Sequence, residues 1–334
     1  MFHVKQSAFV SKRVLLKSAS MRYHPLGATG LEVSVISYGA SPLGSVFRDI
    51  DESQGIRAVH TALDLGINLI DCSPYYGLTK AETVLGRALA GVGREKYILT
   101  TKVGRYGDDE FDFSAQRVSR SIDESLRRLG VEHIDIIQCH DIEFGDLDQI
   151  VDETLPALRR VQESGKVRFI GITAFPIAAL QYVAERASID TILSYCNYSL
   201  NNSLLENSLD FWNAKSIGII NASPLSMGLL TQRGAPEWHP ADAITKETCA
   251  RAATLCADQG LDIAQLAIQF AVSNSNIATT LVGTASPHNI AKNVDWSEEP
   301  LNPELLNQVL EILRPIHNRT WATGRPGKTA AASS

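Results

Sequence analysis

The sequence predicts a single closed (β/α)8 barrel, in which eight parallel strands alternate with eight helices. Three observations support this fold class. Short apolar runs alternate with segments of helical periodicity along the chain, which is typical of a parallel sheet. Eight such units follow one another without a long polar linker, which favours one barrel over two domains. No G-x-G-x-x-G run follows the first strand, so the chain lacks the signature of an open dinucleotide-binding sheet.

The first half of the chain supplies an N-terminal β-hairpin and four strand–helix units. A turn at 26–31 separates two short strands, and the apolar run from Val35 to Tyr38 is the first strand of the barrel. The helical segments show one apolar face each, and Gly66 and Gly130 mark two of their ends. We expect further strands at 68–71, 97–102 and 134–139, and helices at 52–65, 81–89, 115–129 and 147–164.

The second half continues the alternation and adds one helix after the ring. Strands are expected at 169–172, 191–193, 217–220 and 279–282, with helical stretches at 177–186, 203–214, 262–272 and 287–294. The segment 303–313 is predicted to be an extra C-terminal helix. Residues 21–322 therefore form the predicted barrel.

Two terminal segments differ in composition from the barrel. Residues 1–20 contain four basic residues, several serines and no acidic residue. Three interpretations remain open for them: an organellar transit peptide, a disordered extension, or a start of translation at Met21. The segment 323–334 is rich in Gly, Pro, Ala and Ser, and we expect it to be disordered.

Composition excludes several classes of partner. The formal net charge is −6, whereas a nucleic-acid-binding face needs clustered basic residues. No apolar run approaches the roughly 18–20 residues that cross a bilayer. The 5 cysteines include no C-x-x-C pair, so we expect neither a disulfide framework nor a metal site. Cys249 and Cys256 lie on a helical pattern that indicates core positions. A cytoplasmic, monomeric or weakly homo-oligomeric protein is expected, with organellar import through residues 1–20 as the alternative.

Polar residues end three successive predicted strands. Asp71, Lys102 and His140 stand at these ends, and Tyr76 follows Asp71 by about one turn of chain. Each residue alone has an ordinary structural explanation, as a cap, a solvated lysine or a structural histidine. Because chemistry in a barrel is carried by the C-terminal ends of the strands, we expect the four side chains to meet there.

Together these side chains suit proton transfer. Lys102 would pair with Asp71, favour the phenolate of Tyr76 and lower its pKa. His140 would donate a hydrogen bond to a substrate oxygen and orient it. No metal is needed, and no Ser or Cys nucleophile is implied. The combination therefore favours proton transfer coupled to hydride transfer over hydrolysis.

The same stretches resemble the aldo-keto reductases. The likeness extends from about Met21 to about Trp296 and includes the family's Asp, Tyr, Lys and His tetrad: Asp71 in I-D-C-S-P-Y-Y-G, Tyr76 immediately before its glycine, Lys102 after Thr-Thr, and His140 in Q-C-H-D. Within the family, G-A-S-P-L-G-S-V-F at 39–47 and C-H-D-I-E-F at 139–144 resemble members that oxidise L-galactose, D-arabinose or L-fucose. The resemblance implies oxidation of an aldose hemiacetal at C1 to a lactone, with Tyr76 as the general acid–base.

The resemblance also implies a nicotinamide cofactor bound without a dinucleotide-binding fold. The cofactor contacts that it implies are Thr173, Ser194, Ser223, Leu225, Gly283, Thr284, Ser286, Asn289 and Asn293. Gly283 and Asn289 replace the Lys and Arg with which many members grip the 2′-phosphate of NADP, so NAD is predicted as the preferred cofactor. The usual carboxamide-binding Asn and the nicotinamide-stacking Tyr are replaced by Ala174 and Ala222.

The loops at the mouth of the barrel offer residues for a sugar. The substrate-binding candidates are Phe47, Tyr76, Arg105, His140 and Trp238, with Tyr106 and His239 as neighbouring loop candidates. Two alternatives to an aldose dehydrogenase remain. One is a related enzyme that acts on pyridoxal or reduces aldehydes and ketones, and the other is a partner-binding sensor like the potassium-channel β subunits, which share the fold and tetrad.

Overall fold

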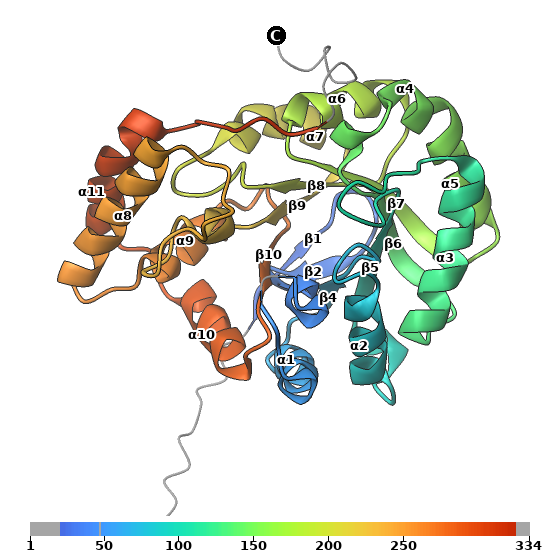
Figure 1. The fold of residues 1–334 in the computed structure, drawn as a ribbon, viewed down its shortest axis with the longest axis horizontal. Helices are drawn as coiled ribbons and strands as arrows, with labels where there is room; N and C mark the ends of the chain where they lie inside the picture. The colour runs from blue at the N-terminus through green and yellow to red at the C-terminus, as the bar shows by residue number, and fades with distance from the viewer. Residues whose placement is uncertain (1–20, 47, 325–334) are drawn as a thin grey trace, which may run out of the picture.

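The computed structural model describes residues 21–46 and 48–324, and its centre is a closed barrel of eight parallel strands (Figure 1). The barrel order is β10-β3-β4-β5-β6-β7-β8-β9, so neighbours in sequence are neighbours in space and the first and last strands close the ring. The strands are β3 (Ile36–Gly39), β4 (Leu69–Asp71), β5 (Ile98–Val103), β6 (Ile134–Cys139), β7 (Val167–Ala174), β8 (Thr191–Tyr195), β9 (Gly218–Ala222) and β10 (Thr279–Gly283). The predicted fold class is confirmed.

The closing seam joins β3 to β10. Thr280 pairs with Ile36 in parallel register, and Gly283 pairs with Gly39. The hydroxyl groups of Ser37 and Thr279 form a hydrogen bond across the same seam. The barrel therefore has no free strand edge in its described part, which removes the pairing hazard of an open sheet.

A two-stranded antiparallel hairpin covers the N-terminal end of the barrel. It consists of β1 (Tyr23–Pro25) and β2 (Glu32–Ser34), as the sequence predicted. Its turn residue Leu26 is completely buried and packs with strand residues such as Leu69 and Ile220. The hairpin thus closes the end of the barrel opposite to the tetrad.

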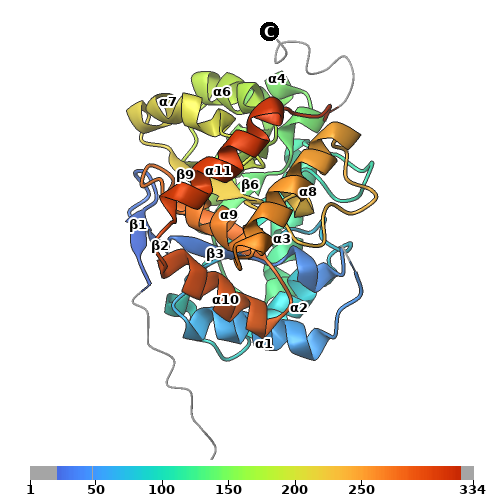
Figure 2. The ribbon, with the colours of Figure 1, turned by 90° about the vertical axis from the view of Figure 1, so that its left-hand side faces the viewer.

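Helices surround the barrel (Figure 2). The helices are α1 (Glu52–Asp64), α2 (Lys80–Leu89), α3 (Ala115–Leu129), α4 (Leu147–Gln149), α5 (Leu155–Glu163), α6 (Ile177–Arg186), α7 (Leu209–Ala214), α8 (Ala243–Asp258), α9 (Ile263–Ala271), α10 (Pro287–Glu298) and α11 (Pro303–Leu313). The predicted extra helix is α11, which packs against α8. Cys249 and Cys256 on α8 are buried in that contact, so their prediction as core residues is confirmed.

Two helical predictions need correction. The expected continuous helix at 147–164 is divided into α4, a π-helical turn at Ile150–Thr154 and α5. The helical stretch at 203–214 begins as a 3-10 helix at Leu204–Ser208 before α7. Hydrogen-bond spacing within a helix does not follow from apolar periodicity, so these local variants were not predicted. None of the helices in the described ranges is long and apolar enough to cross a membrane.

After α11 the chain returns across the C-terminal end of the barrel. We call residues 317–324 the C-terminal strap; in Figure 1 it runs from α11 toward α6 and α4. Trp321 of the strap stacks on Phe175 with ring centres 4.8 Å apart, and its ring also meets His239 edge-on. The strap therefore begins within the predicted barrel domain and extends two residues into the predicted tail, whose remaining residues lie outside the described ranges.

Candidate active site

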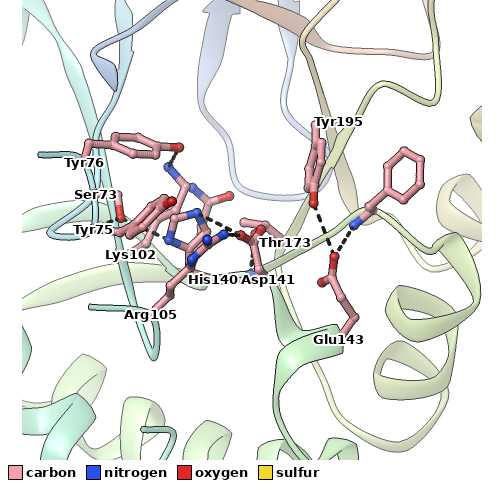
Figure 3. Close-up of polar contacts among 12 residues, drawn as sticks. Ser73, Tyr75, Tyr76, Lys102, Arg105, His140, Asp141, Glu143, Thr173 and Tyr195 are labelled. Carbon is pink, nitrogen blue, oxygen red and sulfur yellow. Dashed lines mark hydrogen bonds and ion pairs between the residues drawn. The ribbon is translucent and has the colours of Figure 1, made fainter. Parts of the chain in front are cut away.

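The four tetrad residues come together at the C-terminal end of the barrel: Figure 3 labels Tyr76, Lys102 and His140, and Asp71 pairs with Lys102. Asp71 is the last residue of β4, Lys102 lies in β5, and His140 directly follows β6. Parallel pairing aligns Asp71 with Thr100 and Lys102 with Gln138, which brings the three strand ends to one level. Their side chains are almost completely buried, so the site is shielded from bulk water.

Lys102 is the centre of the hydrogen-bond network. Its ammonium forms an ion pair with Asp71 and donates to the Cys72 carbonyl at 2.8 Å and to the Tyr76 hydroxyl at 3.4 Å. The other oxygen of Asp71 accepts from Thr100 and Gln138 at 2.6 and 3.0 Å. Burial lowers the pKa of Lys102, but the charges of Asp71 and Tyr76 outweigh it and raise the pKa above its ordinary value. The lysine therefore stays charged.

The pKa of Tyr76 departs from the sequence-based expectation. Burial penalises the phenolate and raises the pKa of Tyr76 above its ordinary value, while Lys102 acts in the expected direction but does not offset the burial. The expectation of a lowered pKa was therefore wrong for this state of the protein. The negative charge of Asp71 offsets part of the stabilisation that Lys102 gives to the phenolate, because Asp71 lies closer to the ammonium than the phenol does. Tyr76 is consequently a proton donor near neutral pH.

His140 is held in one tautomer. Its Nδ1 lies 3.1 Å from the hydroxyl of Ser73, and that hydroxyl oxygen already accepts from the Tyr75 amide at 3.1 Å. We infer that the Ser73 hydroxyl donates its hydrogen bond to Nδ1, which acts as the acceptor. The ring hydrogen of His140 then lies on Nε2. Burial, with a smaller contribution from the charge of Lys102, lowers the pKa of His140 to about 3. The ring is thus a neutral donor whose N–H can face a substrate oxygen.

Asp141 and Arg105 form an ion pair beside this histidine. Arg105 donates to Asp141 Oδ2 at 2.5 Å, and its guanidinium lies 3.8 Å above the Tyr75 ring. Although burial opposes ionisation, the guanidinium of Arg105 helps to hold the pKa of Asp141 below its ordinary value. Arg105 was predicted as a substrate residue and does lie at the mouth. The role of Asp141 was not predicted, although it follows His140 directly.

A second buried carboxyl group lies on the other side of Asp141. Glu143 accepts from the Phe175 amide at 3.1 Å, from the Tyr195 hydroxyl at 3.3 Å and from the strap residue Thr323 at 3.5 Å. Its Oε2 has no hydrogen-bond partner among residues 21–46 and 48–324. Burial, reinforced by the charge of Asp141, raises the pKa of Glu143 to about 8. Glu143 therefore carries a proton at neutral pH and joins the β8 end to the strap.

Tyr195, like Asp141 and Glu143, was not predicted as a site residue from the sequence. Figure 3 shows its hydroxyl directed at Glu143, on the opposite side of Asp141 from Tyr76. Ser194, which was predicted to contact the cofactor, is fully buried, and its hydroxyl accepts from Asn197 at 2.9 Å.

The other predicted cofactor residues occupy two regions of the mouth. Thr173 is buried at the end of β7, where its hydroxyl accepts from the Asp141 amide at 2.9 Å. Ser223 has a left-handed backbone after β9, with Leu225 beyond it. Ser286 caps α10, and Asn289 and Asn293 lie on the same helix. A helix N-terminus with hydroxyl and amide donors fits the phosphate and ribose groups of a dinucleotide.

The end of β10 leaves its backbone accessible. Gly283 is exposed at the strand end beside Gly39, and Thr284 follows it. No Lys or Arg occurs from Gly283 to Asn289. The ammonium of Lys292, one turn further along α10, lies 4.6 Å from the centre of the Trp296 ring.

The remaining substrate candidates differ in their surroundings. Trp238 is 54% exposed in the loop after β9, whereas its neighbour His239 is buried and bonded to the Ser226 carbonyl at 3.1 Å. Tyr106 is buried with the Arg117 guanidinium 3.6 Å above its ring. His239 and Tyr106 therefore support the loops, and the geometry does not place them as substrate contacts. Phe47 lies outside the described residues.

Comparisons with known proteins agree with this geometry. A model of the Aldo/keto reductase family matches residues 35–314. The chain is 47% identical over 308 residues to an L-galactose dehydrogenase from Arabidopsis thaliana, covering 90% of this chain and 96% of the relative. It is 36% identical over 256 residues to a D-arabinose 1-dehydrogenase from Saccharomyces cerevisiae, covering 72% and 76%. A solved aldo-keto reductase from Bacillus halodurans, in its holo form, is similar with a TM-score of 0.76 at 26% identity, covering 91% and 99%.

Proposed function

Because this chain belongs to the aldo-keto reductase family, we propose that it is an NAD-dependent aldose 1-dehydrogenase that oxidises L-galactose, or a related aldose, at C1 to the lactone. The chain is an oxidoreductase that acts on CH–OH groups. The observation that carries the proposal is the placement of Tyr76 beside Lys102 and across from a neutral His140. The identity to an L-galactose dehydrogenase over nearly the full length supports the choice of sugar.

The reaction follows from the two groups that flank the reacting oxygen. The C1 hydroxyl of the cyclic sugar would accept a hydrogen bond from His140 Nε2 and donate its proton to Tyr76. A bound oxidised nicotinamide supplies the hydride acceptor for C1–H and brings a positive charge to the mouth. Tyr76 must be ionised before it can accept the proton, and Lys102 acts in that direction. In reverse, protonated Tyr76 donates to a carbonyl oxygen that His140 orients.

We further propose that NAD is preferred over NADP. A 2′-phosphate carries two negative charges and is best held by fixed cations. Gly283 and Asn289 supply none, and Lys292 lies against the Trp296 ring. A 2′-hydroxyl is therefore the better match for this end of the site. A higher kcat/KM with NADP than with NAD would contradict this part of the proposal.

A second candidate function is the reduction of an aldehyde. It is favoured by one observation, the raised pKa of Tyr76, because a protonated phenol is the form that a reductase needs.

Initial rates of NADH formation decide between the two. We would offer L-galactose, D-arabinose, L-fucose and D-galactose with NAD and then with NADP. Turnover of L-galactose with NAD supports the proposal in full, and turnover spread over several aldoses supports a broader aldose dehydrogenase. If none of the four sugars is oxidised and an aldehyde is reduced with NADPH, both the proposed substrate and the proposed cofactor preference are contradicted.

A further inference from the structure

Asp141 lies beside the position at which the substrate oxygen must bind. Its Oδ2 is 3.6 Å from Nε2 of His140, the nitrogen that we assign as the donor to that oxygen. This distance is too long for a hydrogen bond between the two side chains. It leaves a carboxylate oxygen and an N–H group side by side, one accepting and one donating, at the same place in the mouth.

The surrounding chain holds Asp141 in a fixed orientation. Its backbone has a φ of 51°, in the left-handed region that few residues other than glycine adopt. The Thr173 hydroxyl accepts from the Asp141 amide and donates to Oδ1 at 3.2 Å, while Arg105 donates to Oδ2. A conformation of this kind persists only where the surrounding contacts determine it. The carboxylate is therefore directed by its contacts.

The carboxylate retains capacity for another partner. An ionised carboxyl group has about four acceptor sites, and Thr173 and Arg105 take one on each oxygen. The side chain is 7% exposed, at the mouth of the barrel. Because Asp141 is kept ionised beside Arg105, it accepts hydrogen bonds and donates none. A ligand group that meets it must be a donor.

We propose that Asp141 is a specificity-determining residue that accepts a hydrogen bond from a hydroxyl on the carbon next to the reacting one. A substrate with two oxygens on adjacent carbons can accept from His140 with the first and donate to Asp141 with the second. A substrate that lacks the second hydroxyl leaves a buried charge without that partner. The inference deepens the proposed function, on which its choice of sugar rests, and assigns α-hydroxylated carbonyls and their hemiacetals as the preferred class.

The test compares paired substrates in the wild type and in Asp141→Asn. Asn keeps the size of the side chain and tolerates the left-handed backbone, but loses the charge. We would measure NADH formation with L-galactose and 2-deoxy-L-galactose, and NADH oxidation with D-glyceraldehyde and propanal. Asp108→Asn is the matched control, because Asp108 is an exposed carboxylate of the neighbouring loop that bonds Tyr75. NADH affinity, followed by fluorescence titration, reports whether the mouth is intact.

The wild type should prefer the hydroxylated member of each pair by about 10- to 150-fold in kcat/KM, the range for a hydrogen bond to a charged group. In Asp141→Asn both preferences should fall toward one, because kcat/KM should fall more for the hydroxylated member of each pair than for the other, and NADH affinity should stay within about threefold of the wild type. Asp108→Asn should keep the preferences. If Asn at 141 does not give a folded protein, Asp141→Gly replaces it, because glycine adopts this φ freely.

Two further outcomes separate this inference from the proposed function. If the sugars are not oxidised but the glyceraldehyde preference is present and disappears in Asp141→Asn, the proposed sugar is wrong and the role of Asp141 stands. If the variant loses activity equally on all four substrates, or keeps the wild-type preferences, the role of Asp141 is refuted whatever the sugar result.

Discussion

At the scale of single residues, Tyr76 carries the most direct prediction. Tyr76→Phe removes the acid–base group and little volume, so turnover should fall by about 10²- to 10⁴-fold. NADH affinity should stay near the wild-type value, because the phenol oxygen bonds only Lys102 among the described residues. Stopped-flow rates and a fluorescence titration measure the two quantities. Near-full activity in the variant would remove Tyr76 from the mechanism.

The pH dependence of the wild type provides an independent check of the same residue. Since the pKa of Tyr76 is raised, ionisation is incomplete near neutral pH and the rate of oxidation should rise with pH. His140 does not compete over this range, because its pKa of about 3 keeps it neutral above about pH 5.

Glu143 gives a prediction for stability. Its folded pKa of about 8 exceeds the ordinary value of 4.5, so between these values the folded state holds a proton that the unfolded state releases. The free energy of unfolding of the wild type should therefore fall as pH rises from about 5 to 8, by up to about 1.4 kcal/mol per pH unit from this group. Glu143→Gln cannot titrate at this position. The free energy of unfolding of the variant, relative to that of the wild type, should therefore be higher at pH 8 than at pH 5.

Urea denaturation of both proteins at the two pH values measures this difference. Parallel changes in the wild type and Glu143→Gln would show that Glu143 is ionised in the folded protein. Gln keeps an oxygen for the Phe175 amide, so the variant should retain the fold near Tyr195.

The sequence predicted the meeting of the tetrad but not the shell around it. Asp71, Lys102 and His140 could be placed because each ends an apolar run, and parallel strands end at one level. Glu143 and Tyr195 could not, since Glu143 lies in a short 3-10 turn and its partner Thr323 is 180 positions away in sequence. The raised pKa of Tyr76 also depends on burial, which the residues alone do not reveal.

At the scale of elements, the loop after β4 depends on a close approach between two glycines. Gly77 has a φ of 63°, and a Cβ on it would lie 2.0 Å from the Gly44 carbonyl oxygen. Gly77→Ala should therefore displace the loop, lower stability and reduce activity severely, because Tyr76 is the adjacent residue. Gly91→Ala is the matched control, since its φ is 81° and nothing lies within 4 Å. The control should lose about 1–2 kcal/mol of stability and keep its activity.

Thermal unfolding and initial rates distinguish the two variants. If the two variants lose the same amount of stability and both keep their activity, the close approach to Gly44 does not fix the position of the Tyr76 loop.

The strands and most helices were predictable because their apolar patterns are regular. The strand Ile134–Cys139 and the helix Pro303–Leu313 have the predicted bounds. The π-helical turn at Ile150–Thr154 was not predictable, since it shares its apolar pattern with an α-helix. Helix α8 was not among the predicted elements, because eight strand–helix units already accounted for the barrel without it. Only the helical spacing of its two cysteines was noted.

At the scale of the whole molecule, the N-terminal hairpin should contribute stability without contributing to turnover. Leu26 is fully buried at the end of the barrel opposite to the tetrad, so Leu26→Ala should cost about 2–5 kcal/mol in the free energy of unfolding. Ile244→Ala, at a 57% exposed position on α8, is the control and should change it by less than about 0.5 kcal/mol. Below the unfolding transition both variants should keep the wild-type kcat. A loss of kcat in Leu26→Ala alone would link the two ends of the barrel.

The seam between β3 and β10 also sets an order in time. Ser37 and Thr279 are 242 positions apart, which corresponds to roughly 12–50 s of synthesis at 5–20 residues per second on a ribosome. The strands β4 and β5, which carry Asp71 and Lys102, and β6, which His140 follows, pair in sequence and emerge in the first half of that interval, whereas Gly283 and α10 emerge after it. The residues of the acid–base tetrad are therefore all synthesised well before the residues that complete the predicted cofactor site. Until β10 pairs with it, β3 has an open edge on that side of the sheet, and an open edge is where another chain can pair.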